Sequence, residues 1–143
     1  MILLDTNVIS ELMRPEPEPR VLRWLSAQSL ERIHLAALTV AEIRRGLALL
    51  PPGARRQSLE QSFDRFLELG FSRRILPFSE ASAVVHAPIY ARRVQAGLGI
   101  GELDILLAAI ATEHSASIAT RNTGDFDRTG VSIINPWTAD TPG

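Results

Sequence analysis

The chain begins with MILLDTNVISELMR (residues 1–14), and this stretch decides how the rest of the sequence can fold. Its apolar run, residues 1–4, stops at Asp5, and apolar residues at helical spacing resume at Val8. A short apolar run followed directly by a helix is typical of a buried strand in an α/β protein. A carboxylate directly after a buried strand is costly unless it has a partner. Asp5 is therefore the first candidate for a functional residue.

The composition is that of one globular domain. Among 143 residues, 45% are hydrophobic and 22% are charged, which predicts a packed core. No apolar run approaches the ~20 residues that cross a bilayer, and the start lacks the basic region of a signal peptide. The absence of cysteine excludes disulfides and thiolate zinc sites. We therefore expect a cytoplasmic protein that does not associate with a membrane.

The basic residues are unusual in kind rather than in number. The net charge is −1, and all 15 basic residues are arginine. Four Arg-Arg pairs occur, at residues 44–45, 55–56, 73–74 and 92–93. Arginine binds phosphate with a bidentate fork, so the pattern is compatible with a nucleic-acid partner. Solvated helix faces explain most of these pairs equally well.

Strands alternate with helices along the chain, which predicts βαβ units around a parallel sheet covered on both faces. Thr39 is the expected N-cap of one helix, and Ser79 is the expected N-cap of a long one that ends before residues 97–101. Residues 1–137 are expected to form one domain and residues 138–143 a loose tail. The expected strands are 2–4, 32–39, 73–78, 117–120 and 131–137, and the other expected helices are 8–13, 21–27, 55–69 and 102–114.

Four acidic residues lie where an expected strand ends or a helix begins. Asp5 follows the first strand, and Glu42 lies in the first turn after Thr39. Asp104 lies in the first turn of the helix after residues 97–101, and Asp125 lies in the loop after the fourth strand. Ligands of such folds bind at the carboxyl ends of the strands. If the four acids share one pocket there, their repulsion requires either protonation or a cation. Oxygen ligands without cysteine or suitably spaced histidine favour Mg²⁺ or Mn²⁺ over zinc.

Each acid also has a purely structural explanation. Thr39 and Glu42 fit a capping box, Asp104 suits a helix N-terminus, and Asp125 suits a turn. The apolar residues 105–109 after Asp104 indicate a largely buried helix, which argues against a simple surface role for this acid. Asp5 is the hardest of the four to explain without a function.

Four segments of the chain resemble, in order, the acidic motifs of PIN-domain ribonucleases. They are ILLDTNVIS (2–10), TVAEIRRGL (39–47), GELDILLAAIA (101–111) and ATRNTGDF (119–126), the last followed by VSIINPW (131–137). More narrowly, the chain is similar to VapC-type toxins of bacterial toxin–antitoxin pairs, in the FitB-like subgroup. The resemblance runs from Ile2 to Trp137. One such motif alone is weak evidence, whereas four in order with family-like spacing are specific.

The resemblance implies a three-layer α/β/α sandwich with a central parallel sheet and Mg²⁺-dependent cleavage of RNA. It also implies a cognate antitoxin, a small DNA-binding protein, that occludes the acidic pocket, and a homodimer. The catalytic residues that it implies are Asp5, Glu42, Asp104 and Asp125. Of these, Asp5 and Asp104 would hold Mg²⁺, or Mn²⁺ in its place.

The fourth acid is where this chain departs from part of the family. Some relatives carry an acid at the position of Asn122, whereas this chain has its acid at Asp125. Because many VapC-like proteins share this form, the resemblance assigns Asp125 as the fourth acid and Asn122 as a polar helper. Three further polar side chains would orient the ligands: Thr6, Asn7 and Thr120.

Three other functions compete with this interpretation. A phospho-receiver domain also places acids around Mg²⁺, but it needs a lysine, which this chain lacks. A structure-specific DNA nuclease would show a similar acidic cluster, usually together with DNA-gripping modules that are missing here. A catalytically idle PIN scaffold that serves as a protein-binding module has no need to keep all four acids.

Overall fold

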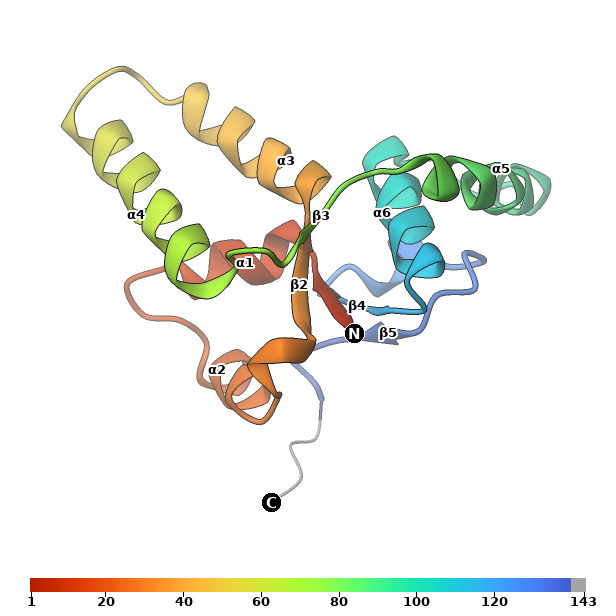
Figure 1. The fold of residues 1–143 in the computed structure, drawn as a ribbon, viewed down its shortest axis with the longest axis horizontal. Coiled ribbons are helices and arrows are strands. Elements are labelled where there is room, and N and C mark those ends of the chain that lie inside the picture. The colour runs from red at the N-terminus through yellow and green to blue at the C-terminus, as the bar shows by residue number, and fades with distance from the viewer. Residues whose placement is uncertain (140–143) are drawn as a thin grey trace.

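The computed structural model describes residues 1–139, and its strands form a five-stranded parallel sheet (Figure 1). The strand order is β3-β2-β1-β4-β5, so the first strand of the chain lies at the centre. The strands are β1 (Ile2–Leu4), β2 (Ile33–Ala36), β3 (Ile75–Leu76), β4 (Ser117–Ala119) and β5 (Ile133–Ile134). The helices are α1 (Thr6–Leu12), α2 (Pro19–Ser26), α3 (Ala37–Ala48), α4 (Ala54–Gly70), α5 (Glu80–Gln95) and α6 (Glu102–Glu113). Short 3-10 turns span Leu30–Arg32 and Thr123–Phe126.

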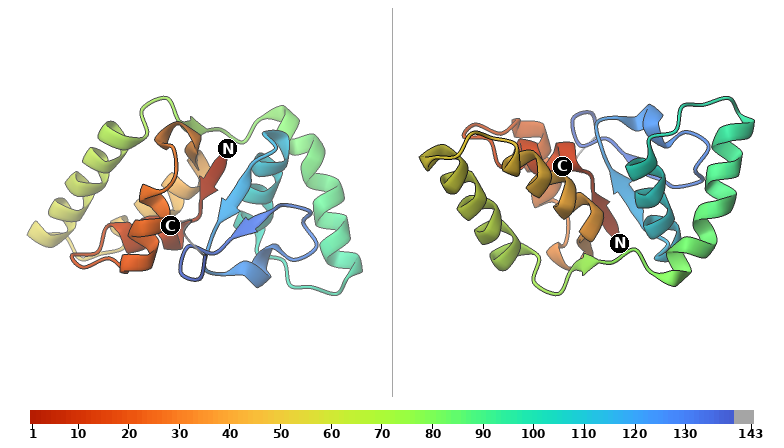
Figure 2. Two further views of the ribbon diagram at one scale, coloured as in Figure 1. Left: turned by 90° about the horizontal axis from the view of Figure 1, so that it is seen from below. Right: turned by 90° about the horizontal axis from the view of Figure 1, so that it is seen from above.

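Helices cover both faces of the sheet, as two further views show (Figure 2). Leu3 and Ile118 point to one face, where they pack with buried residues of α5 and α6. Ile2 and Leu4 point to the other face, where they pack with buried residues of α1, α2 and α4. Successive side chains of a strand alternate between faces, so a fully apolar strand such as β1 needs both layers. The predicted three-layer α/β/α sandwich is confirmed.

Several predicted boundaries differ from the structure: the first helix begins at Thr6 rather than at residue 8, and the strands expected at 32–39, 73–78 and 131–137 are shortened to β2, β3 and β5. One further difference changes the surroundings of a candidate site residue. The helix expected to begin at Thr39 begins at Ala37, with Ala36 as its N-cap and no side-chain cap. Thr39 is buried inside the first turn, and Glu42 lies in the second turn rather than the first. The capping box of Thr39 and Glu42 therefore does not form. Ala and Leu are strong helix formers, so residues 37 and 38 join the helix instead of extending β2.

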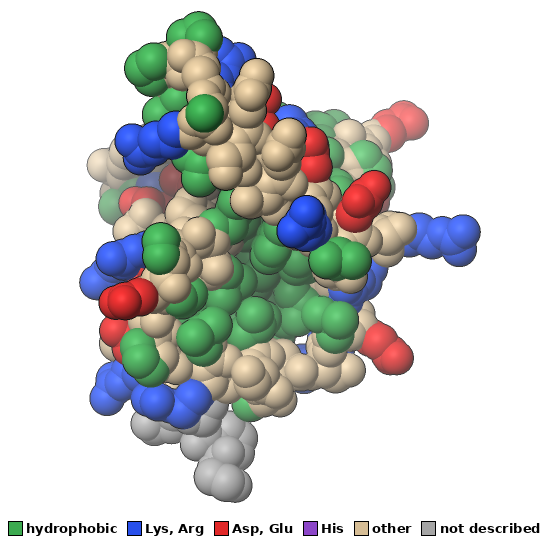
Figure 3. All heavy atoms as spheres, turned by 90° about the vertical axis from the view of Figure 1, so that its left-hand side faces the viewer, with side chains coloured by type: hydrophobic (Ala, Val, Ile, Leu, Met, Phe, Trp, Pro, Cys, Tyr) green, Lys and Arg blue, Asp and Glu red, His purple; other side chains and the backbone are tan. Residues whose placement is uncertain are grey.

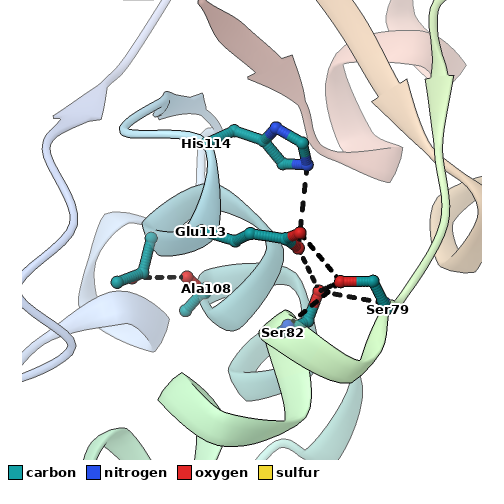
Figure 4. A network of polar contacts seen from close by, with 6 residues as sticks. Ser79, Ser82, Ala108, Glu113 and His114 are labelled. Atoms are coloured by element: carbon teal, nitrogen blue, oxygen red, sulfur yellow. Dashed lines mark hydrogen bonds and ion pairs between the residues drawn. The ribbon is translucent and has the colours of Figure 1, made fainter.

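Helices α5 and α6 are joined by a polar contact between their ends (Figure 4). As predicted, Ser79 caps α5: its hydroxyl accepts from the backbone N–H of Ser82 at 3.1 Å. The hydroxyls of both serines donate to the carboxylate of Glu113, at the end of α6. These hydrogen bonds, led by that from Ser82, lower the pKa of Glu113. The carboxylate stays ionised and holds α5 against α6.

The residues after β5 pack against the face of the sheet that α1 and α2 cover. The backbone N–H of Ala139 donates to the carbonyl of Asn135 at 2.8 Å, and Ala139 packs at the margin of the core. The expected tail, residues 138–143, thus begins with ordered residues, and its remainder lies outside the described part of the chain. Across residues 1–139, no helix is long and apolar enough to cross a membrane.

We expect the central strand to carry much of the stability of the fold. Leu3 of β1 is completely buried, so Leu3→Ala should lower the free energy of unfolding by about 2–5 kcal/mol. Urea unfolding monitored by circular dichroism measures this. Leu49→Ala is the matched control: Leu49 is 81% exposed, and its loss should change stability by no more than about 0.5 kcal/mol. Equal effects of the two changes would contradict the placement of β1 in the core.

Candidate active site

A pocket of about 570 Å³ opens at the carboxyl edge of the sheet. It brings together all four acids singled out from the sequence, which come from four separate parts of the chain. Three of the four polar neighbours, Thr6, Asn7 and Asn122, also line it, whereas Thr120 is buried behind it. The residues that line the pocket are Asp5, Thr6, Asn7, Ser10, Glu11, Arg14, Glu42, Asp104, Arg121, Asn122, Asp125 and Trp137.

Asp5 lies at the junction of β1 and α1 and is only 7% exposed. It is the N-cap of α1, because its Oδ1 accepts from the backbone N–H of Thr6 at 2.8 Å. Its Oδ2 accepts from the Thr120 hydroxyl at 2.8 Å and from Asn7 Nδ2 at 3.3 Å. Both carboxylate oxygens are therefore held in place by neighbouring groups.

Thr120 is the centre of a small network that joins the ends of β1 and β4. Its hydroxyl donates to Asp5 and accepts from Asn7 Nδ2 at 3.2 Å and from the backbone N–H of Asn122 at 3.0 Å. Asn7 Oδ1 accepts from the backbone N–H of Arg121 at 3.1 Å. A hydroxyl has one donor and two acceptor sites, so Thr120 is fully satisfied. The network orients Asp5 relative to the loop after β4.

Glu42 and Asp104 approach the pocket from two helices. The Thr6 hydroxyl donates to Glu42 Oε2 at 2.8 Å, which links α1 to α3. Asp104 lies in the first turn of α6, as predicted. A Cβ atom at position 101 would lie 2.7 Å from Asp104 Oδ2, so this orientation of the carboxylate requires Gly101. Gly101, the N-cap of α6, therefore leaves room for this carboxylate.

The charges of the four acids interact. Burial raises the pKa of Asp5, and Glu42 and Asp125 raise it further, although hydrogen bonds from Thr120 and Thr6 oppose the shift. Burial, followed by the charges of Asp5, Asp125 and Glu42, raises the pKa of Asp104 to about 6. Near neutral pH the pocket thus holds more negative charge than its own residues neutralise. The charge of Asp125 acts on Asp5 and Asp104 although Asp125 lies on the exposed 3-10 turn Thr123–Phe126.

A buried arginine contacts the two loops that lie next to Asp104 and Asp125. Arg93, on the last turn of α5, is 6% exposed. Its Nη1 donates to the carbonyl of Asp127 at 2.8 Å, and its Nη2 donates to the carbonyl of Gly99. Its charge lowers the pKa of Asp104, partly offsetting the acids. No sequence pattern pointed to Arg93 as a site residue, because contacts to backbone carbonyls leave no motif.

The donor set of the pocket fits a hard divalent cation. Within residues 1–139, no three His, Cys, Asp or Glu side chains are gathered tightly enough to enclose a metal ion. Mg²⁺ typically keeps several waters and takes only one or two carboxylates from the protein. The buried Asp5 and the half-buried Asp104 are the acids whose ionisation is most hindered, so a cation beside them relieves the greatest repulsion. Carboxylate oxygens without thiolate ligands do not select zinc.

Five other residues of the pocket wall were not predicted from the sequence: Ser10, Glu11, Arg14, Arg121 and Trp137. One signal was available, because Glu11 follows Asn7 by one helical turn and so shares its face of α1. Glu11 is buried and forms an ion pair with Arg14 at 2.9 Å. Trp137 ends the last matching motif, but nothing in the sequence placed its ring beside the acids.

The sequence matches the PIN domain family over residues 2–131. Over 139 residues it is 45% identical to plasmid stability protein StbB of Pseudomonas syringae pv. tomato, which covers 97% of this chain and 100% of that protein. Over 137 residues it is 44% identical to toxin FitB of Neisseria gonorrhoeae (96% and 99% covered) and 42% identical to VapC ribonuclease Y4jK of Sinorhizobium fredii (96% and 98%).

Solved structures agree with these similarities. The crystal structure of FitAcB from Neisseria gonorrhoeae superposes with a TM-score of 0.90 at 44% identity, covering 97% of this chain and 100% of that chain. The same score is found for the structure of FitAB bound to an IR36 DNA fragment, at 43% identity and 99% coverage of both chains. With four acids gathered at the carboxyl edge of a parallel sheet, this chain belongs to the PIN-domain family.

Proposed function

We propose that this chain is a metal-dependent endoribonuclease and the toxin of a toxin–antitoxin pair. The observation that carries the proposal is the convergence of Asp5, Glu42, Asp104 and Asp125 on one pocket, with the pKa values of Asp5 and Asp104 raised. Similarity to a VapC ribonuclease and to toxin FitB supports RNA as the substrate. The cytoplasm, where its RNA substrate lies, is the proposed place of action.

Mg²⁺ is the proposed cofactor, with Mn²⁺ able to replace it, and Asp5 and Asp104 are its proposed ligands. Held by these two carboxylates, such a cation would supply Lewis-acid chemistry for hydrolysis of a phosphodiester. Mg²⁺ suits the pocket because it needs few protein ligands and accepts substrate phosphate oxygens beside them.

The residues of the chain orient the acids for this reaction. Thr120 and Asn7 hold Asp5, and Thr6 holds Glu42. Outer hydrogen bonds of this kind fix the direction in which a carboxylate presents its oxygens. Asp125 contributes charge from the exposed rim, which favours a cation at the acids.

An assay of RNA and DNA cleavage separates the proposed ribonuclease from the two remaining alternative functions. A structure-specific DNA nuclease would cut DNA in preference to RNA. A catalytically idle scaffold would cut neither, although its acidic pocket would still bind a cation. The superposition with toxin structures over nearly the whole chain supports the ribonuclease over both.

We expect the purified protein to cleave structured RNA with Mg²⁺ or Mn²⁺ and to stop when EDTA is added. Asp5→Asn and Asp104→Asn should each lower the rate at least ~10²-fold, the order expected when an essential catalytic group is removed. Gel analysis of a labelled RNA measures both effects. Asp64→Asn, an exposed acid of α4 outside the pocket, is the matched control and should keep full activity. Undiminished cleavage in EDTA or by Asp5→Asn would refute the mechanism.

Asp125 and Asn122 can be distinguished through the stability that Mg²⁺ confers. A ligand that binds only the folded state raises the melting temperature. Asp125→Asn should stabilise the metal-free protein, because it removes a charge that acts on Asp5 and Asp104, and it should shrink the rise caused by Mg²⁺. Asn122→Ala should leave most of that rise in place. Melting curves with and without Mg²⁺ measure this, and the opposite pattern would make position 122 the important one.

The proposed antitoxin has a surface beside the pocket on which it can dock. An apolar groove of about 500 Å³ lies between α1, α3 and α4, and Met13, Ile43, Leu47 and Leu59 contribute to its wall. It shares Thr6, Ser10, Arg14 and Glu42 with the acidic pocket. The side of the molecule that carries α4 and α2 is hollowed and lined with hydrophobic side chains (Figure 3). The solved structure of FitAB bound to an IR36 DNA fragment supports a DNA-binding antitoxin as the partner.

The proposed assembly consists of a homodimer of this chain and an antitoxin that occludes the pocket, and each of the two can be tested separately. Exposed apolar residues of α5, Val84 and Val94, support a homodimer through that helix, because such side chains gain by burial. An antitoxin segment that reaches the acids should present Arg or Lys, and changing that residue to Glu should abolish inhibition. Light scattering at micromolar concentration measures the copy number. A monomer would refute the dimer, and unimpaired inhibition by the Glu variant would refute occlusion.

A further inference from the structure

One arginine of the pocket wall lies over an aromatic ring. The Arg121 Cζ lies 5.1 Å from the centre of the Trp137 ring, and both residues line the acidic pocket. Trp137 is half-buried and packs at the margin of the core, whereas Arg121 is exposed. The indole therefore restrains the guanidinium from the protein side while the exposed side chain remains open to solvent. A guanidinium stacked in this way is a preorganised fork for an oxyanion.

The backbone of Arg121 is fixed relative to the acids. It follows β4 directly after Thr120, and its N–H donates to Asn7 Oδ1 at 3.1 Å. Asn7 and Thr120 both donate to Asp5 Oδ2. The backbone of Arg121 thus contacts the residues that orient Asp5, and its side chain contacts Trp137. Its position beside the proposed metal site is set at both ends.

The charge balance of the pocket distinguishes Arg121 from the other cation in its wall. Arg14 is paired with the buried Glu11 at 2.9 Å, so its charge is already compensated. None of the ion pairs found among residues 1–139 includes Arg121. An RNA strand carries one negative charge per phosphate, and the acids of the pocket repel it. A cation that no carboxylate neutralises, at the rim of that pocket, opposes this repulsion.

We infer that Arg121, held by Trp137, binds a phosphate of the RNA strand beside the bond that is cleaved. The inference rests on the proposed ribonuclease function and names a contact that positions its substrate. A phosphate suits the site better than a base, because it is charged and the N–H groups of a guanidinium match its oxygens in a bidentate way. An acidic antitoxin segment is the competing ligand.

The number of phosphates contacted can be measured from the salt dependence of binding. For single-stranded nucleic acid, the slope of log K against log salt falls by about 0.7 for each phosphate neutralised. In the Asp5→Asn background with Mg²⁺, which keeps the strand uncut, Arg121→Gln should reduce that slope by about 0.7 for a short single-stranded RNA. It should also weaken binding by about tenfold, the size of one charge-assisted hydrogen bond. Fluorescence anisotropy of a labelled oligonucleotide measures both.

A matched control exists elsewhere on the surface. The Arg74 Cζ lies 5.3 Å from the centre of the Phe71 ring, so it is stacked like Arg121 but lies outside the acidic pocket. Arg74→Gln should leave the slope and the affinity unchanged. Trp137→Phe keeps a ring beneath Arg121 and should bind nearly as well as the parent. Trp137→Leu should weaken binding while it keeps the slope, because the charge remains but is no longer held.

The cleavage reaction provides the second measurement. In the otherwise unchanged protein, Arg121→Gln should raise KM about tenfold and leave kcat within about twofold, since the contact is made equally before and during the reaction. An unchanged slope and KM, in a protein that cleaves RNA, would overturn the inference alone. So would a loss of antitoxin binding with RNA binding intact. A parent protein that neither binds nor cleaves RNA would overturn the proposed function, and this inference with it.

Discussion

The hydrogen bond from the buried Thr120 hydroxyl to Asp5, 2.8 Å long, joins the ends of the two strands at the centre of the sheet. It follows from the register, because Leu4 of β1 pairs with Ala119 of β4. The next residue of each strand is then brought opposite its counterpart, and the Asp5 N–H continues the ladder to the carbonyl of Ala119 at 2.9 Å. A buried carboxylate without partners would cost several kcal/mol. Here the parallel pairing itself supplies the partner.

Everything else in the pocket is arranged around this fixed carboxylate. Glu42 extends from α3 and accepts a hydrogen bond from the Thr6 hydroxyl. Asp104 extends from α6, and its carboxylate lies beside Gly101. Arg93 holds the loops next to Asp104 and Asp125 from behind. Burial of Asp104, and after it the charges of Asp5, Asp125 and Glu42, raise the pKa of Asp104 to about 6. Perturbed pKa values of this kind are typical of functional sites.

Sequence patterns predicted the features that depend on neighbouring residues, and they did not predict contacts between residues far apart in the chain. Asp5, Asp104 and Ser79 were placed correctly, because a strand end or a helix start is encoded by the residues directly around it. Thr39 failed as an N-cap, since helix propensity at residues 37 and 38 outweighed the capping signal. Glu42 then found its donor in Thr6, which lies 36 residues away. No local rule predicts such a partner.

By itself, the sequence determined that the fold is a parallel α/β sandwich and that four acids lie at strand or helix ends, because apolar periodicity and strand-end polarity are properties of short segments. The tertiary structure alone decided that these acids share one pocket, that Thr120 faces Asp5, and that Arg121 stacks on Trp137. The contact between Thr120 and Asp5 alone joins residues 115 positions apart. Strand order and register set these contacts, and no pattern within a single segment encodes which strands become neighbours.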